Sequence, residues 1–334
     1  MNFRILVLIL FFPFLALSQR TLQGKVTTSQ GEPLPDASVY FDGTTIGTIT
    51  VEDGSFSIEM PADTSISLVI SMLGYETIYV NGYAQANKKI TVQLRESTEQ
   101  LDAVILEEDT WSRAKKLSEF KRIFLGANPP ARECTILNED ALKLIYIPSK
   151  ELLTAYAEEP LIIENRFLGY RLRYTLTDFT AQYNTPLGGL QQSGLTYYAG
   201  LSFFEELKEK PRRKQLKNRE LAYLGSTFHF LKSLRSKSLT QNGFKVFADR
   251  KEVPPYTFIN VFDYNGEKGV TFKGDDPLII MYDNNLQTSM LVRDTLTIDK
   301  FGNHTPPDAL TVGGNMGARK IAFLLPLDYQ STDD

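Results

Sequence analysis

Histidine and cysteine are scarce in this 334-residue sequence, which contains two histidines and one cysteine. The histidines, His229 and His304, both lack a glutamate at the spacing of a ligand pair. A catalytic zinc centre takes three protein ligands, most often histidines and a carboxylate. The sequence therefore predicts no metal site, and no motif in it indicates any other cofactor.

A recognisable nucleophile is also missing. The Gly-x-Ser-x-Gly elbow of many serine hydrolases does not occur. Ser226 and His229 stand three residues apart on an expected helix and could touch, but we expect a half-buried, hydrogen-bonded histidine between Phe228 and Phe230. We therefore predict no catalytic residue. A hydrolase of unknown type in the C-terminal part of the chain remains the alternative.

Acidic residues are numerous but poorly arranged for catalysis. Glu158 and Glu159 are adjacent, so on a strand they would point to opposite faces. Asp275-Asp276 is bracketed by glycine and proline, which indicates a turn. We expect solvated loop acids at both places. The formal net charge of −4 also argues against a nucleic-acid partner.

The one long apolar run stands at the start of the chain. Ile5–Leu15 follows Arg4 and precedes Ala16-Leu17-Ser18, which offers small residues at the two positions that a signal peptidase reads. Residues 1–18 are thus a predicted signal peptide. Its removal leaves 35 basic and 40 acidic residues, and a net charge near −5. No later run is long enough to span a bilayer. The single Cys134 cannot form an internal disulfide, and we expect it to be buried.

Short strands separated by turn residues follow in residues 20–95. Asp53-Gly54 is typical of a hairpin turn, and Phe56 and Ile58 alternate with polar residues after it. Leu68–Leu73 is apolar on both faces, as in a strand inside a sandwich. This spacing predicts a small β-sandwich.

This segment contains five ordered motifs, Leu22–Val26, Pro33–Val39, Gly47-Thr48, Asp53–Ile58 and Ile70–Glu76. Together they resemble the carboxypeptidase regulatory-like domain. The resemblance implies a seven-stranded, transthyretin-like (prealbumin-like) β-sandwich without catalytic residues of its own. It also implies an accessory role, because the family places this domain beside carboxypeptidase domains and in front of TonB-dependent outer-membrane receptors.

Residues 96–110 are a predicted linker that contains a lone strand at Leu101–Leu106. This strand resembles the stretch that precedes the plug of TonB-dependent receptors. The residues that remain are too few for the large barrel of such a receptor.

Residues 111–334 are predicted to form a second domain of the α+β class, with an antiparallel sheet and a long helical insert. Trp111–Phe124 has helical spacing and ends near Gly126, and Tyr170–Thr177 alternates as a half-buried strand does. Several motifs here resemble an uncharacterised region that follows the regulatory-like domain in short envelope proteins, which names no function. Further strands are predicted near residues 142–146, 258–264, 270–272, 278–282, 289–293 and 321–325, with a loop at 313–317.

The helical insert, residues 203–239, concentrates basic residues in an acidic protein, which predicts a polarised surface. Its apolar stripe is expected to include Leu221, Leu224 and Phe228. Lipid phosphates, an anionic polysaccharide or an acidic protein face are the candidate partners; an ordinary solvated helix is the alternative. The candidate binding patch is Lys208, Lys210, Arg212, Arg213, Lys214, Lys217, Arg219 and His229.

Together these patterns predict an exported protein of the Gram-negative cell envelope, periplasmic or associated with the outer membrane. Its expected role is non-enzymatic, as a binding or structural accessory module. Its expected partner is an envelope protein, a glycan or an anionic lipid headgroup. A hydrolase, or an accessory of a TonB-dependent uptake system, is the alternative.

Overall fold

The computed structural model describes residues 20–61, 64–83, 89–97, 108–184, 192–264 and 266–331. The predicted signal peptide and the predicted strand at residues 101–106 lie outside these residues. The contacts divide the chain into two compact units, one comprising Met1–Phe41 and Ile46–Thr98 and the other Asp42–Thr45 and Glu99–Asp334. The structure is mainly β, with antiparallel sheets and short helices, which confirms the predicted fold class.

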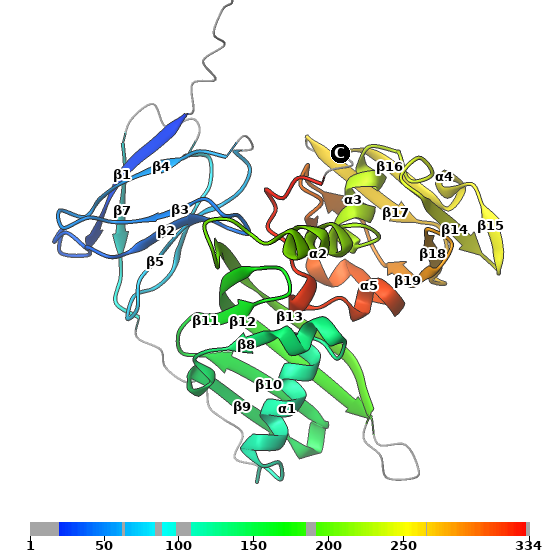
Figure 1. Cartoon of the computed structure of the whole chain (residues 1–334), viewed down its shortest axis with the longest axis horizontal. Helices are drawn as coiled ribbons and strands as arrows, with labels where there is room; N and C mark the ends of the chain where they lie inside the picture. The colour runs from blue at the N-terminus through cyan, green and yellow to red at the C-terminus, as the bar shows by residue number, and fades with distance from the viewer. Residues whose placement is uncertain are drawn as a thin grey trace, which may run out of the picture. The chain divides into compact units, whose positions relative to one another are not determined.

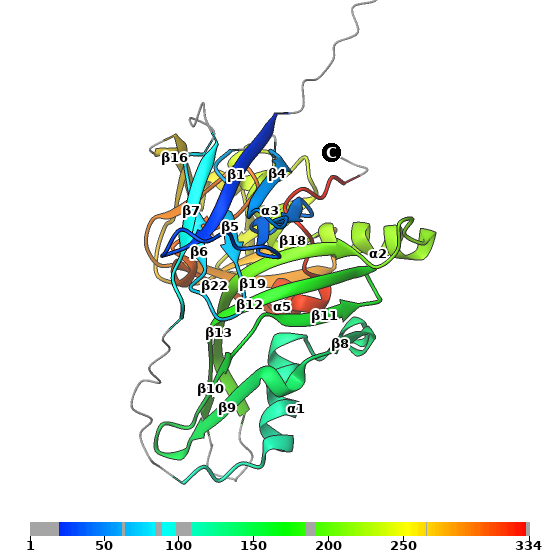
Figure 2. The ribbon, with the colours of Figure 1, turned by 90° about the vertical axis from the view of Figure 1, so that its left-hand side faces the viewer.

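The first unit is a β-sandwich of two sheets (Figures 1 and 2). One sheet has the order β4-β1-β7, in which β1 pairs antiparallel with β4 and parallel with β7. The other has the order β3-β2-β5-β6. These seven strands agree with the sandwich expected from the motifs. They are β1 (Thr21–Thr28), β2 (Ser38–Phe41), β3 (Gly47–Ile49), β4 (Ser55–Glu59), β5 (Leu68–Ser71), β6 (Ile78–Val80) and β7 (Ile90–Leu94).

Two of the motif residues have a clear structural role in the sandwich. Gly24 on β1 faces the ring of Phe56 on β4, and a Cβ at position 24 would overlap that ring. Gly54 adopts φ +76°, which favours glycine, and follows Asp53, whose carboxylate accepts a hydrogen bond of 2.8 Å from the Ser55 amide. The motifs thus serve strand packing and turns.

The second unit begins with a six-stranded antiparallel sheet covered by helix α1 (Figure 1). Strands β12 and β13 pair along most of their length, as Figure 2 also shows. Helix α1, Arg113–Phe124, ends before Gly126, as predicted, and Gly126 has φ +116°. The strands are β8 (Cys134–Ile136), β9 (Leu142–Ile147), β10 (Leu152–Ala157), β11 (Leu161–Asn165), β12 (Tyr170–Asn184) and β13 (Gln192–Glu206).

Two further antiparallel sheets share a second core in the same unit, into which α3, Thr227–Arg235, packs Phe230, Leu231 and Leu234. The sheet orders are β15-β14-β18-β19-β22 and β16-β17-β20-β21. The strands are β14 (Phe244–Ala248), β15 (Lys251–Val253), β16 (Ile259–Tyr264), β17 (Glu267–Phe272), β18 (Leu278–Tyr282), β19 (Leu286–Val292), β20 (Leu296–Ile298), β21 (His304–Thr305) and β22 (Leu310–Gly313).

The helical insert is divided more than the sequence indicated. Its first residues complete β13, and the rest forms α2, Arg213–Tyr223, and α3. Gly225 separates the two helices with φ +66°, a conformation that a helix cannot contain. The predicted apolar stripe is therefore interrupted, and Leu221 is 56% exposed. None of the described helices is long and apolar enough to cross a membrane.

Two predictions near the C-terminus were wrong. The expected loop at residues 313–317 is largely helix α5, Gly314–Ala318, and the expected strand at residues 321–325 is a 3-10 turn, Ile321–Phe323. The apolar run is buried, but the amide of Ala322 donates to the Leu125 carbonyl oxygen at 3.2 Å instead of joining a sheet. Burial alone had produced the strand-like pattern.

Cys134 is a buried thiol on β8, as predicted, and is 9% exposed. Its Sγ donates to the carbonyl oxygen of Pro130 at 3.8 Å. Burial, and to a smaller extent Glu133, raises the pKa of this thiol to about 12. Such a thiol is protonated near neutral pH and is a poor nucleophile.

Candidate ligand pocket in the second unit

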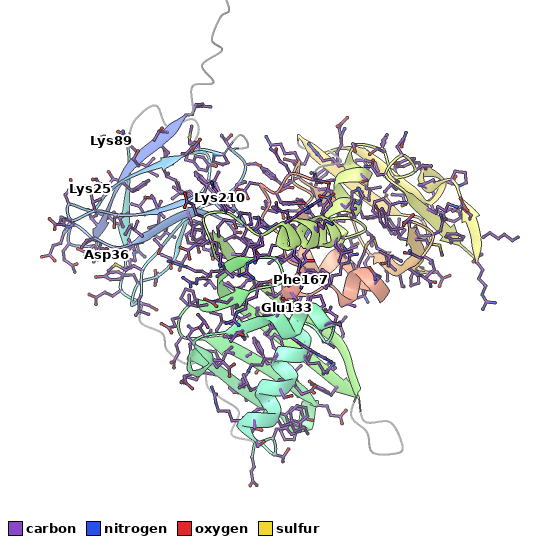
Figure 3. All side chains as sticks on the ribbon, viewed as in Figure 1. Lys25, Asp36, Lys89, Glu133, Phe167 and Lys210 are labelled. Atoms are coloured by element: carbon purple, nitrogen blue, oxygen red, sulfur yellow. The ribbon has the colours of Figure 1, made fainter. Side chains whose placement is uncertain are left out.

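Only part of the predicted basic patch is exposed to solvent. Six of its eight members are exposed, in the segment after β13 and on α2, and Figure 3 labels one of them, Lys210. Whether this surface binds an anionic partner stays a prediction. The exposed six are Lys208, Lys210, Arg212, Arg213, Lys214 and Lys217.

Arg219 is not part of that surface, because it is 5% exposed. Its Nη1 and Nη2 donate to the two carboxylate oxygens of Glu206 at 2.8 and 2.7 Å, and its Nε donates to the Leu168 carbonyl oxygen at 2.8 Å. The guanidinium also lies 3.8 Å from the ring centroid of Tyr170. Arg219 therefore joins α2 to the end of the β12–β13 ladder.

His229 is also buried, at 6% exposure, so it too leaves the patch. Its Nδ1 accepts a hydrogen bond of 3.2 Å from the Gly225 amide, and its ring packs 4.9 Å from the rings of Tyr223 and Phe244. Ser226 is the N-cap of α3, and its Oγ accepts from the His229 backbone amide at 3.0 Å. The described contact between the two residues is thus a helix cap, which joins the Ser226 side chain to the backbone of His229.

A cavity of about 310 Å³ lies in the second unit. Its walls come from β12 and β13, the first turn of α3, the turn before β21 and residues 316–327. Pockets of this size hold small molecules. The apolar wall comprises Ala222, Phe228, Leu231, Met316, Ile321, Phe323, Leu324, Leu325 and Leu327.

Arg319 lies in the wall of the cavity and stabilises the end of α2. Its Nη1 donates to the carbonyl oxygens of Ala222 and Leu224 at 3.0 and 2.8 Å, and to that of Leu221 at 3.3 Å. Its Nε donates to Asn315 Oδ1 at 3.2 Å. These carbonyls belong to the last turn of a helix, where they lack amide partners and a cation is favourable. Burial lowers the pKa of Arg319 from its usual value.

Lys320 is the second cation of the cavity wall. Its Nζ lies 5.7 Å from the ring centroid of Tyr198, within reach of a cation–π interaction. Burial lowers the pKa of Lys320 below its usual 10.5, with no acidic group acting in the opposite direction. The structure describes no salt bridge or hydrogen bond of this ammonium group.

Hydroxyl groups and one imidazole complete the polar part of the wall. Tyr174 and Tyr198 come from paired strands, and burial raises the pKa of both phenols, so both are protonated. Burial lowers the pKa of His304 below 6.5, against smaller opposing effects from Pro307 and Asp299, so its ring is neutral near pH 7. The two phenols can each donate a hydrogen bond, whereas the neutral imidazole donates its one N–H to the backbone of Pro307 and its other nitrogen can only accept.

Gly200 on β13 shapes this wall. A Cβ at position 200 would overlap the ring of Tyr174 and the carbonyl oxygen of Thr175. The missing side chain therefore lets the Tyr174 ring lie against the neighbouring strand. Ser202, Ser226, Thr227 and Asn303 add further polar groups to the lining.

The lining has a marked charge asymmetry. Among the described residues that form it, two are cations and none is an aspartate or glutamate. The described part of the chain also contains no group of three His, Cys, Asp or Glu side chains that could hold a metal ion. The arrangement is chemically suited to bind an anion with an apolar body.

The sequence reasoning missed this pocket almost entirely. Of the lining residues, it named only Ser226 and His304 as candidates for chemistry, Ser226 for serine hydrolysis and His304 for metal binding. The lining residues are spread between positions 174 and 327 of the sequence, so no local motif could reveal the pocket. The one available signal was Arg319-Lys320, two adjacent cations at the start of an apolar run.

Comparison with known proteins identifies the first unit. Residues 22–106 match the family model of the CarboxypepD_reg-like domain. This segment is a CarboxypepD_reg-like domain. The match ends before the first residue of the pocket lining, so the domain and the cavity are separate features of the chain.

The chain is also similar to a bacterial receptor. The TonB-dependent receptor SusC of Bacteroides thetaiotaomicron is 35% identical over 108 residues. These are 31% of this chain and 10% of the receptor, so the chain spans a tenth of the receptor's length. The CarboxypepD_reg-like domain and this similarity agree with the resemblance inferred from the sequence motifs.

Proposed function

We propose that this chain is a non-enzymatic, exported protein of the Gram-negative cell envelope that acts as a binding accessory of a TonB-dependent uptake system. The similarity to a TonB-dependent receptor, 35% identity over 108 residues, carries the proposal. A chain that shares this segment with such a receptor is a candidate to work beside a full receptor.

The different features of the two units support a binding role. The CarboxypepD_reg-like domain uses its motif residues for packing and turns, as Gly24 and Gly54 do. The second unit contains the cavity with its two cations. We assign the contact with an envelope partner to the domain and the binding of a small ligand to the second unit.

The hydrolase alternative gains little from the geometry. The Ser226 Oγ accepts the His229 amide as a helix cap, and the His229 imidazole accepts the Gly225 amide. Neither contact activates a serine, which needs its hydroxyl bonded to an imidazole nitrogen. A screen of ester, glycoside and peptide substrates tests this point. Turnover that is lost in His304→Ala would contradict the non-enzymatic account.

Reciprocal co-purification from the native host tests the uptake role. The full chain would be tagged and isolated from solubilised outer membranes, with an unrelated exported protein bearing the same tag as control. We expect a TonB-dependent receptor to co-purify, and the same receptor, when tagged, to recover this chain. If the chain is absent from the envelope, or if neither tag recovers the other protein, the proposed role is wrong.

A further inference from the structure

No acidic side chain is among the described residues that line the cavity. Asp42 lies behind the lining, where its Oδ1 accepts from the amide of Ser202 at 2.8 Å. All four described hydrogen bonds of the Arg319 side chain go to neutral oxygens, three of backbone carbonyls and one of the Asn315 amide. These bonds orient the guanidinium but leave its charge in place. Lys320 has no described bonding partner beyond the face of Tyr198. Two adjacent cations in a partly buried cavity without an acid favour an incoming anion.

The first turn of α3 adds to this preference. Thr227 and Phe228 line the cavity and are the first two residues of the helix. Their amides have no acceptor within the helix, because the first four amides of any α-helix lack one. The N-terminal end of a helix also carries a partial positive charge. It reinforces the field of Arg319 and Lys320 and is not needed to define the site.

The remaining wall indicates what the anion is attached to. Most of the lining is aliphatic or aromatic, which suits an apolar or flat ring body. Tyr174 and Tyr198 can both stack against such a body and donate through their hydroxyl groups. An inorganic anion would meet the cations but would leave this wall unused.

We propose that this cavity is a binding site for a small organic acid, with its carboxylate, sulfate or phosphate group at Lys320 and Arg319 and its ring or apolar body against Tyr198 and Phe228. The inference rests on the proposed role as a binding protein and names the ligand class of that role. Lys320 is the residue with a free ammonium group, so it supplies most of the selectivity for an anion.

Calorimetric titration of the purified full chain tests the site with four probes. Benzoate and phenyl phosphate carry an acid on a ring, benzylamine carries the opposite charge on the same ring, and inorganic phosphate has no ring. We expect at least one aromatic acid to bind in the millimolar range or tighter, about −4 kcal/mol or better. Benzylamine should not bind, and inorganic phosphate should bind more weakly than phenyl phosphate.

Variants locate the binding. Lys320→Met removes the charge and keeps the chain length, and it should weaken the aromatic acid about tenfold or more. Lys320→Arg should retain most of the affinity. Lys251→Met, at an exposed position on β15 and outside the predicted basic patch, is the matched control and should not change it. Tyr198→Phe, which removes one hydroxyl and keeps the ring, should weaken binding by a smaller factor. Thermal unfolding of each variant establishes that it is folded.

Three results would overturn the site. They are absence of binding by both aromatic acids at roughly 10 mM, equal affinity in Lys320→Met and wild type, and equal losses in Lys320→Met and Lys251→Met. None of these titrations involves a receptor. Failure here therefore leaves the co-purification result intact, and a failed co-purification leaves this result intact.

Discussion

The guanidinium of Arg219 and the carboxylate of Glu206 form a bidentate ion pair, with N–O distances of 2.8 and 2.7 Å. Arg219 is on α2 and Glu206 is the last residue of β13, so the pair joins the helix to the ladder that forms one wall of the cavity. Planar guanidinium geometry suits two parallel bonds to one carboxylate, and the ring of Tyr170 covers its face.

Arg219→Lys should therefore destabilise the protein although it keeps the charge. A lysine cannot make the paired bonds to Glu206 or the additional bond to the Leu168 carbonyl oxygen. We expect the free energy of unfolding to fall by about 1–3 kcal/mol, measured by urea denaturation. Arg213→Lys, at an exposed position on the same helix, should change it by less than about 0.5 kcal/mol. Equal effects would contradict the structural role of Arg219.

Lys320 should lower the free energy of unfolding, because its ammonium group is partly buried in the cavity wall. Burial disfavours its charged form, and no acid compensates. Lys320→Met should raise the free energy of unfolding by about 1 kcal/mol, allowing for its partial exposure, whereas Lys214→Met should leave it nearly unchanged. A residue that weakens binding and strengthens the fold when removed has a functional signature. Lower stability in Lys320→Met would argue for a structural role.

His304 gives the protein a pH dependence near neutrality. Burial holds its folded pKa below 6.5, so the unfolded chain binds more protons as the pH falls from about 7 to about 5.5. The stability that neutral His304 contributes is present above 6.5 and is lost as the pH falls through its folded pKa. Asp42, whose carboxylate accepts the amide of the lining residue Ser202, titrates in the same window, because burial raises its pKa to about 6. Its effect has the opposite sign, since the folded state then binds more protons than the unfolded chain as the pH falls. His304→Gln should therefore raise the urea midpoint at the acidic end of this window relative to that of the wild type, with Asp42 present in both proteins. Parallel curves for both proteins would refute this assignment.

Local sequence patterns correctly predicted much of the fold. Leu278–Tyr282 was predicted with its observed bounds, and α1 was predicted to end near Gly126. The alternation and helical spacing in these elements record directly which side is buried. Residues 321–325 record burial equally well, but packing between other elements buries them without a sheet. The insert was predicted as a long helical segment without a break, because the break at Gly225 depends on a single positive φ.

The site could not be predicted in the same way. Arg219 was placed in a surface patch because its neighbours are basic, and only the structure shows Glu206 and Tyr170 around it. Arg319 and Lys320 line a cavity whose other walls include β12, β13 and the first turns of α3, which are far from them in sequence. Their lack of an acidic partner is a property of three-dimensional packing. Sequence patterns report burial and charge, and they do not report which charges remain uncompensated.

The exposed basic surface on α2 supports a separate prediction. At low salt, Lys214→Gln with Lys217→Gln should lower the binding constant for vesicles of phosphatidylglycerol and phosphatidylcholine, measured by co-sedimentation, about thirtyfold, because each lysine near an anionic surface contributes about 1 kcal/mol. The matched control changes two exposed lysines of the first unit, Lys25 and Lys89, which Figure 3 labels. Equal losses in both double variants would remove α2 as a specific membrane-facing surface.

A crystal structure of the full chain with phenyl phosphate tests the central claim of a ligand pocket most directly. The account predicts phosphate oxygens within about 3 Å of Lys320 Nζ, with the phenyl ring against Tyr198 and Phe228. A probe bound only outside the cavity, or a cavity filled by rearranged protein side chains, would contradict it.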